Sequence, residues 1–168
     1  RKKIAKTLED YADDEKREEA ELDAIEEATS IEEALTDDEK SVLRTLRNWA
    51  SAASNKSDAK ADAVVEWLEE NLKVDGVWSD KRVILFTEYR TTQGWLQQIL
   101  AMRGFGSERL EIIHGGMDQE DREKVRAAFQ ASPSVSPVRI LLATDAASEG
   151  IDLQNHCSRM IHIEIPYN

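Results

Sequence analysis

The sequence has few of the residues that mark membrane, disulfide-rich or fibrous proteins. It contains one cysteine, three prolines and seven glycines in 168 residues, and it has no long apolar run. A lone Cys157 cannot form an internal disulfide, and a missing apolar run excludes a transmembrane helix. Little proline and glycine argues against a disordered or fibrous chain. We therefore expect one domain, or one domain with an appendage, in a reducing, cytoplasmic compartment and without a membrane partner.

Positive charge is also scarce, and the deficit lies in one part of the chain. The formal net charge is −12, from 22 Lys and Arg against 34 Asp and Glu. Residues 1–80 hold 12 basic and 23 acidic side chains, a net of −11, which leaves 10 and 11, a net of −1, for residues 81–168. Because binding to nucleic acid usually requires a basic face, the acidity argues against such a partner. The nearly neutral second half can still carry a local basic patch.

The first half has the periodicity of helices. Residues 1–35 carry a thin apolar stripe among acidic residues, which predicts a mostly solvated helix that packs along one narrow face. Thr36 and Glu39 have the spacing of a capping box ahead of a second helix. A third helix is predicted over residues 58–73, with Gly76 as its breaker. We expect the four tryptophans to be packing residues without a chemical role: Trp49, Trp67, Trp78 and Trp95.

The second half alternates buried-strand patterns with helical ones. Residues 82–87 form a continuous apolar run, which is typical of a strand buried on both faces. We predict strands over residues 82–87, 109–114, 138–144 and 159–165. Alternation of strand and helix predicts right-handed crossovers and an α/β fold, with a parallel sheet covered by helices on both faces. We expect an acidic helical extension at residues 1–54 and the sheet domain at residues 55–168.

Polar residues follow the carboxyl ends of the predicted strands, where open parallel sheets bind their ligands. The stretch ILLATDAASEGIDLQ, residues 140–154, ends a strand in Thr144 and Asp145 and continues through hydroxyl and acidic residues. Such a strand-to-helix turn offers backbone N–H groups and hydroxyls to an anion or a ribose. Capping of a helix by Asp145 and Ser148, with Gly150 at its end, explains the same residues and is the commoner use.

Two further motifs at strand ends also have both a functional and a structural interpretation. Gly115 and Gly116 precede a helix start, where backbone can approach a phosphate, but a tight turn and a helix capped by Asp118 explain them equally well. The Arg90 guanidinium can bind a phosphate, but it can equally form a surface ion pair that contributes little to stability. His114 is a candidate polar contact, and it has no second His or Cys at metal-binding spacing.

Several catalytic motifs are absent from the sequence. It has no G-x-x-x-x-G-K-[ST] phosphate loop, no Asp-Glu metal box and no G-x-S-x-G element. Without the first two, the chain cannot hold a magnesium nucleotide by itself in the usual way.

Taken in order, the motifs resemble the second RecA-like lobe of superfamily-two helicases and translocases. RVILFTEYR is similar to motif four, ILLATDAASEGIDLQ to motif five, and RMIHIEIPYN to the strand that leads to motif six. The Ser-Glu-Gly-x-x-x-Gln pattern of residues 148–154 and the Pro-Tyr-Asn ending are most similar to the Swi/Snf-type branch, and within it to bacterial members related to the RNA-polymerase-associated translocase. The resemblance covers about residues 81–168 and points to a bacterial or archaeal source.

The resemblance implies roles for the residues at the strand ends. Contacts to a nucleic-acid backbone, expected to be double-stranded DNA, would come from Thr87, Arg90, His114, Gly115, Thr144 and Ser148. The cleft for ATP would be lined by Glu149, Gly150 and Asp152, with Asp152 at the ribose hydroxyl. Because hydroxyls and main-chain N–H groups can hold a backbone, no large positive charge is required. The acidic helices would lie away from this track, against the missing N-terminal lobe or a protein partner.

The resemblance also implies a fragment of a larger motor. An arginine-rich motif six would follow Asn168, and ATP with Mg²⁺ would be held mainly by the N-terminal lobe. We therefore expect the fragment alone to be inactive. Two alternatives stay open: a lobe of a DEAD-box-type RNA helicase, whose fifth motif also reads Thr-Asp-x-x-x-x-Gly-x-Asp, and a non-catalytic α/β module for protein interaction.

Overall fold

The computed structural model describes residues 14–29, 35–54, 56–144 and 155–164 of the chain. Its helices are α2 (Asp14–Thr29), α3 (Asp37–Ala53), α4 (Ala59–Leu72), α5 (Arg90–Met102) and α6 (Gln119–Gln130), with one 3₁₀ turn, η1 (Ser107–Arg109). Its strands are β1 (Lys73–Val74), β2 (Val77–Trp78), β3 (Val83–Thr87), β4 (Leu110–Ile113), β5 (Ile140–Thr144) and β6 (Met160–His162). Within these ranges, no helix is both long and apolar enough to cross a membrane.

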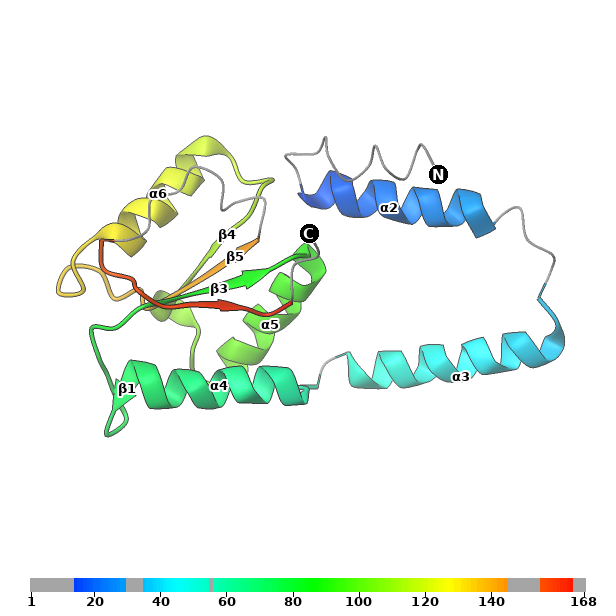
Figure 1. Ribbon diagram of the computed structural model, residues 1–168, viewed down its shortest axis with the longest axis horizontal. Helices are drawn as coiled ribbons and strands as arrows, with labels where there is room; N and C mark the ends of the chain where they lie inside the picture. The colour runs from blue at the N-terminus through cyan, green and yellow to red at the C-terminus, as the bar shows by residue number, and fades with distance from the viewer. Residues whose placement is uncertain (1–13, 30–34, 55, 145–154, 165–168) are drawn as a thin grey trace.

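A four-stranded parallel sheet with the order β4-β5-β3-β6 lies between α6 and the pair α4 and α5 (Figure 1). Helices α4 and α5 cover one face of this sheet, and α6 covers the other. Strands β3 and β5 pair residue by residue from Val83 with Ile140 to Thr87 with Thr144. The parallel α/β architecture predicted from the alternating runs is therefore confirmed.

The two central strands are buried along their whole length. All five residues of β3 and all five of β5 are buried, because each strand has a neighbour on both sides and helices on both faces. Successive side chains point to opposite faces, so Val83 and Leu85 enter the core beneath α4 and α5, whereas Ile84 and Phe86 enter the core beneath α6. Each such side chain contributes about 1.5–3 kcal/mol of hydrophobic stabilisation.

Helices α3 and α6 start with the caps predicted from the sequence, and α4 has a cap that was not predicted. The hydroxyl of Thr36 accepts from the Glu39 N–H, and the Glu39 carboxylate accepts from the Thr36 N–H at 2.8 Å, which is a complete capping box. Asp58 caps α4 by accepting from the Ala61 N–H, and Asp118 caps α6 in the same way from the Asp121 N–H.

The apolar faces of α2 and α3 correct two expectations. Leu22 and Ile25 of α2 are 67% and 60% exposed, so the expected narrow packing face of this helix is not buried. Helix α3 has no buried residue, and Trp49 is 71% exposed. The packing role predicted for the tryptophans is confirmed for the three that pack partly buried against the core, and it is wrong for Trp49. Those three are Trp67, Trp78 and Trp95.

A short hairpin of β1 and β2 joins α4 to the sheet, and the sequence reasoning missed it. Asp75 and Gly76 form its turn, with positive φ angles of 51° and 77°. Asp-Gly is the pair that two-residue hairpin turns with positive φ favour. The signal was therefore present, but strands of two residues each are too short to show an alternating pattern.

Candidate nucleic-acid interface

The carboxyl ends of β3, β4 and β5, with the residues that directly follow them, form one edge of the sheet, which we call the carboxyl rim. Because these strands are parallel neighbours, their ends meet there. The rim brings together Thr87 and Thr144, which are paired in register, and the starts of the segments at Glu88 and His114. Five of the predicted contact residues thus come from three adjacent strand ends: Thr87, Arg90, His114, Gly115 and Thr144.

The two rim threonines lie deeper than a backbone contact requires. Thr87 is 1% exposed and Thr144 is 0% exposed, and the Thr87 hydroxyl donates to the Tyr89 carbonyl at 3.4 Å. Their hydroxyls therefore lie beneath the surface in this structure. The predicted contacts of Thr87 and Thr144 with nucleic acid stay predictions.

Arg90 begins α5 and lies half-buried at the rim. Its guanidinium donates to the side-chain carbonyl of Gln93, one turn further along the helix. The Gln93 amide in turn donates to the carbonyl of Ile113 at 3.0 Å and to that of Leu142 at 2.9 Å. Gln93 is 0% exposed, so these bonds fix the start of α5 to strands β4 and β5.

Gln93 is the residue of this site that the sequence reasoning missed. A glutamine in the first turn of a helix is unremarkable in sequence, because helix surfaces tolerate it everywhere. Its importance comes from burial: an amide without water must find partners for its N–H groups, and the two strand carbonyls supply them. Gln93 accepts from the Arg90 guanidinium and is itself held by strands β4 and β5, so it positions that guanidinium at the start of α5.

The segment after β4 forms a turn. The Met117 N–H donates to the His114 carbonyl at 3.3 Å, and Asp118 then caps α6. The structural interpretation of this motif, a tight turn and a capped helix, is therefore confirmed. The half-buried His114 and Gly115 remain at the rim beside β5, where the functional interpretation predicts a backbone contact.

Two carboxylates reach main-chain donors near the end of β3. The Glu88 N–H donates to the Glu164 carboxylate, just beyond β6, at 3.2 Å. The N–H groups of Arg90 and Thr91 donate to the carboxylate of Glu18 in α2. The expectation that the acidic helices lie away from the track is thus wrong for α2, which reaches the rim through Glu18. Figure 1 shows α2 above this edge of the sheet.

The predicted ATP residues and one predicted nucleic-acid contact lie outside the described residues. They are Ser148, Glu149, Gly150 and Asp152. Within the described part of the chain, no group of three or more His, Cys, Asp or Glu side chains could hold a metal ion.

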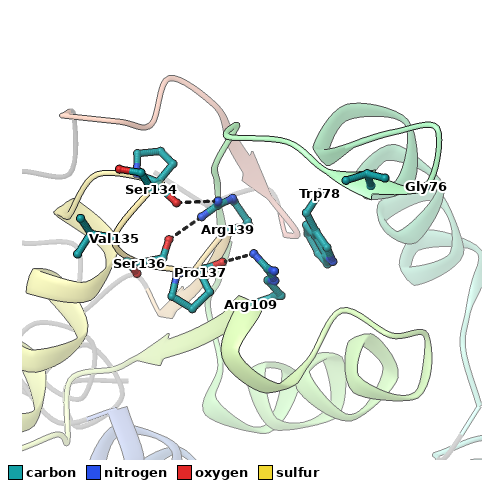
Figure 2. A pocket seen from close by; sticks show the side chains of 10 residues that line it. Gly76, Trp78, Arg109, Ser134, Val135, Ser136, Pro137 and Arg139 are labelled. Carbon is teal, nitrogen blue, oxygen red and sulfur yellow. Dashed lines mark hydrogen bonds between the residues drawn. The ribbon is translucent and has the colours of Figure 1, made fainter.

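A cavity of about 630 Å³ lies at the opposite, amino-terminal edge of the sheet (Figure 2). Arg109 and Arg139 point into it and donate to carbonyls of the loop between α6 and β5: Arg109 to Pro137 at 3.0 Å, and Arg139 to Pro133 and Ser136 at 3.0 and 2.8 Å. These bonds use the two guanidinium groups to hold a loop. The cavity is therefore separate from the carboxyl rim and has a structural explanation.

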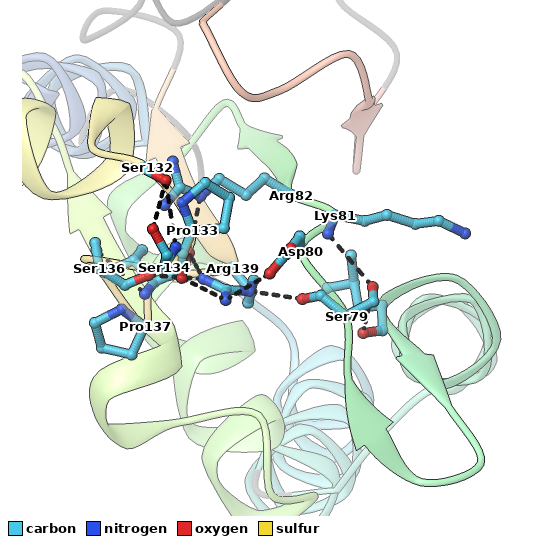
Figure 3. Close-up of polar contacts among 12 residues, drawn as sticks. Ser79, Asp80, Lys81, Arg82, Ser132, Pro133, Ser134, Ser136, Pro137 and Arg139 are labelled. Atoms are coloured by element: carbon cyan, nitrogen blue, oxygen red, sulfur yellow. Dashed lines mark hydrogen bonds and ion pairs between the residues drawn. The ribbon is translucent and has the colours of Figure 1, made fainter.

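Arg82 and Arg139 together anchor this loop to the sheet (Figure 3). Arg139 also donates to the Ser79 carbonyl at 2.7 Å, and Arg82 donates to the carbonyls of Val138 and Ala131 at 3.0 and 2.7 Å. Burial lowers the pKa of both guanidinium groups, and Arg139 lowers that of Arg82 further by repulsion. A guanidinium stays charged despite such shifts, so these are buried cations held by carbonyl dipoles.

Comparison with known proteins agrees with this architecture. Residues 61–168 match the family described as the helicase conserved C-terminal domain. The chain is 36% identical over 89 residues, 53% of its length, to the uncharacterized ATP-dependent helicase YqhH of Bacillus subtilis. It is 30% identical over 116 residues, 69% of its length, to the ATP-dependent RNA helicase eIF4A of Phaeosphaeria nodorum. It is 33% identical over 107 residues, 63% of its length, to the pre-mRNA-splicing ATP-dependent RNA helicase PRP28 of Scheffersomyces stipitis.

The family match covers more than half of the chain, and the chain belongs to the helicase conserved C-terminal domain family. The matched regions amount to 14%, 26% and 20% of the lengths of the three relatives. The chain therefore spans about a quarter or less of the length of each of these relatives.

Proposed function

We propose that this chain is the C-terminal motor lobe of an ATP-dependent DNA translocase of the Swi/Snf type. In this role the carboxyl rim contacts one strand of a nucleic-acid backbone, and the segment after β5 forms one wall of an ATP cleft shared with an N-terminal lobe. The observation that carries the proposal is the rim itself: the neighbouring parallel strands β3 and β5 end in the stretches that resemble helicase motifs four and five, and β4 ends beside β5.

The proposed contacts divide by position. Thr87, Arg90, His114, Gly115, Thr144 and Ser148 belong to the backbone track, and Glu149, Gly150 and Asp152 belong to the ATP cleft. Backbone N–H groups at the start of α5, beside Arg90, suit phosphate oxygens because the first N–H groups of a helix lack partners within it. ATP and Mg²⁺ would be held mainly by the N-terminal lobe, and closure of the two lobes would move the rim along the backbone.

The proposed domain division places an acidic helical extension at residues 1–54 and the motor lobe at residues 55–168. Burial supports a division near this point. Helix α3 has no buried residue, whereas α4 buries five side chains against the sheet.

A second candidate is the C-terminal lobe of an RNA helicase of the DEAD-box type. It is favoured by the relatives whose names include RNA helicase, eIF4A and PRP28. The DNA proposal rests on the Ser-Glu-Gly-x-x-x-Gln pattern at residues 148–154 and on the Pro-Tyr-Asn ending. A non-catalytic protein-interaction module has no comparable support from the relatives.

The test is ATP hydrolysis by a longer protein that carries this lobe together with its N-terminal lobe, measured with double-stranded DNA, with single-stranded RNA and with neither. We expect stimulation by DNA, no activity from the 168-residue chain alone, and a slower turnover in the Asp152→Ala variant because a ribose contact is lost. Stimulation by RNA alone would favour the second candidate. No hydrolysis with either polymer would count against both motor proposals.

A further inference from the structure

An acidic side chain far away in the sequence occupies the start of α5. The N–H groups of Arg90 and Thr91 donate to one oxygen of the Glu18 carboxylate, which belongs to α2 and lies 72 positions before Arg90. The N-cap residue of α5, Tyr89, makes no side-chain capping bond, and the first turn of α5 contains no acidic residue. The positive end of α5 is therefore neutralised by a carboxylate from a different part of the chain.

Helix α2 resembles a nucleic-acid backbone in charge. Its 16 residues, DEKREEAELDAIEEAT, include eight acidic and two basic side chains, a net charge of −6. The helix has no strongly apolar face buried against the sheet, since Leu22 and Ile25 are 67% and 60% exposed. Its attachment to the rim is therefore mainly electrostatic, and such an attachment weakens with salt and yields to a competing polyanion.

Arg90 has a further hydrogen-bond donor at the start of α5, its Nε–H group, which makes no hydrogen bond to Glu18. The Nε atom of Arg90 is buried and has no hydrogen-bond partner among the described residues. The Arg90 guanidinium is held from below through Gln93, so this donor stays at the start of α5. A phosphate has more acceptor oxygens than a carboxylate and can bind the two backbone N–H groups and a guanidinium together.

We propose that α2 is an internal substitute for the nucleic-acid backbone: Glu18 takes the place of one phosphate at the start of α5 and is displaced when a nucleic-acid strand binds. The inference rests on the proposed function of the carboxyl rim. Its consequence is a closed state that competes with binding, so the apparent affinity for nucleic acid is reduced by the fraction of molecules in which α2 is docked.

The first experiment compares Glu18→Gln with Glu19→Gln in the 168-residue chain. Glu19 is exposed on the same helix, so both variants lose one negative charge, and only Glu18→Gln turns charge-assisted hydrogen bonds to the start of α5 into weaker neutral ones. Binding of a fluorescein-labelled 20-base-pair DNA duplex is measured by anisotropy at low salt. We expect Glu18→Gln to bind about three- to tenfold more tightly than the parent and Glu19→Gln to change affinity less than about twofold, with the difference shrinking as salt is added.

A second experiment detects the contact without nucleic acid. Hydrogen exchange at the amides of Arg90 and Thr91 should become faster in Glu18→Ala and stay unchanged in Glu19→Ala, because only the former removes the acceptor oxygen of these N–H groups. Equal exchange in the parent and in Glu18→Ala would overturn the inference, whatever the result with DNA.

The binding data also separate this inference from the proposed function. If Arg90→Ala weakens binding of the duplex while Glu18→Gln binds no more tightly than Glu19→Gln, the rim is an interface and the role of α2 is wrong. If the duplex binds neither the parent nor Glu18→Gln, the proposed interface fails, and the inference that rests on it fails too.

Discussion

The two helical segments α2 and α3 differ from the sheet domain in what covers their apolar residues. Helix α3 has a regular apolar stripe, yet Val42, Leu43, Leu46 and Trp49 are between 50% and 71% exposed. Helix α4, of similar length, buries its apolar stripe against the sheet. The comparison teaches that helical periodicity predicts which face is apolar, whereas only a neighbouring surface decides whether that face contributes stability.

The largest expected effect tests the sheet side of this comparison. Phe129 of α6 is 1% exposed within the core beneath that helix, so Phe129→Ala should lower the free energy of unfolding by about 3–5 kcal/mol, through lost burial and a residual cavity. The measurement is the urea midpoint of the 168-residue chain.

The matched control for Phe129 lies in α3. Trp49→Ala also removes a large aromatic side chain, but from a site that is 71% exposed, so its effect should stay within about 0.5 kcal/mol. Equal losses in the two variants would mean that α3 packs on the sheet domain in solution, and the comparison would be wrong.

A smaller effect is expected at the buried arginine anchor. Arg82→Met keeps much of the side-chain volume but removes the guanidinium that donates to the carbonyls of Phe129, Ala131 and Val138. We therefore expect a loss of about 2–3 kcal/mol in the free energy of unfolding, although the Val138 carbonyl keeps its bond from Arg139. Lys81→Met is the control, since Lys81 is the exposed neighbour of Arg82. An Arg82→Met protein as stable as the control would show that the cost of burying the cation cancels the value of its bonds.

The smallest expected effect is confined to α3. Thr36→Ala removes the hydroxyl of the capping box and should cost α3 about 1 kcal/mol of local helix stability. Hydrogen exchange in the first turn of α3 should become faster, while the urea midpoint of the sheet domain stays unchanged. A shift of that midpoint would contradict the independence of the two regions.

The same cap predicts a pH dependence. Hydrogen bonds from the Thr36 side chain and backbone lower the pKa of the Glu39 carboxyl. An acidic group whose pKa is lower in the folded helix than in the unfolded chain stabilises the helix at pH values above its ordinary pKa. This stabilisation is lost as the pH falls through the lowered pKa. A titration of Glu39 by NMR should therefore show its pKa rising toward the ordinary value in the Thr36→Ala variant.

Much of the fold follows from short stretches of sequence. The continuous apolar run at residues 82–87 predicts a strand buried on both faces, and the structure has this strand, Val83–Thr87, inside the sheet. Thr36 and Asp118 predict helix starts, and both caps are present. These features depend on residues within one or two turns of each other, so local pattern is sufficient to find them.

The candidate site was only partly accessible to the same reasoning. The strand ends that form the rim could be predicted, because parallel strands bring their carboxyl ends together. Gln93 could not be identified, since its partners lie on β4 and β5, 20 and 49 positions away. The depth of Thr87 and Thr144 below the surface also depends on the helices that cover their strands.

By itself, the sequence determined the buried strands, the helix caps and the parallel α/β class, since each depends on local backbone preferences and on the period of apolar residues. Tertiary structure alone decided the strand order β4-β5-β3-β6, the exposure of the α3 stripe and the meeting of Glu18 with the start of α5. The physical reason is distance along the chain: hydrophobic burial and charge pairing act between any surfaces that come together, and local pattern does not specify the partner.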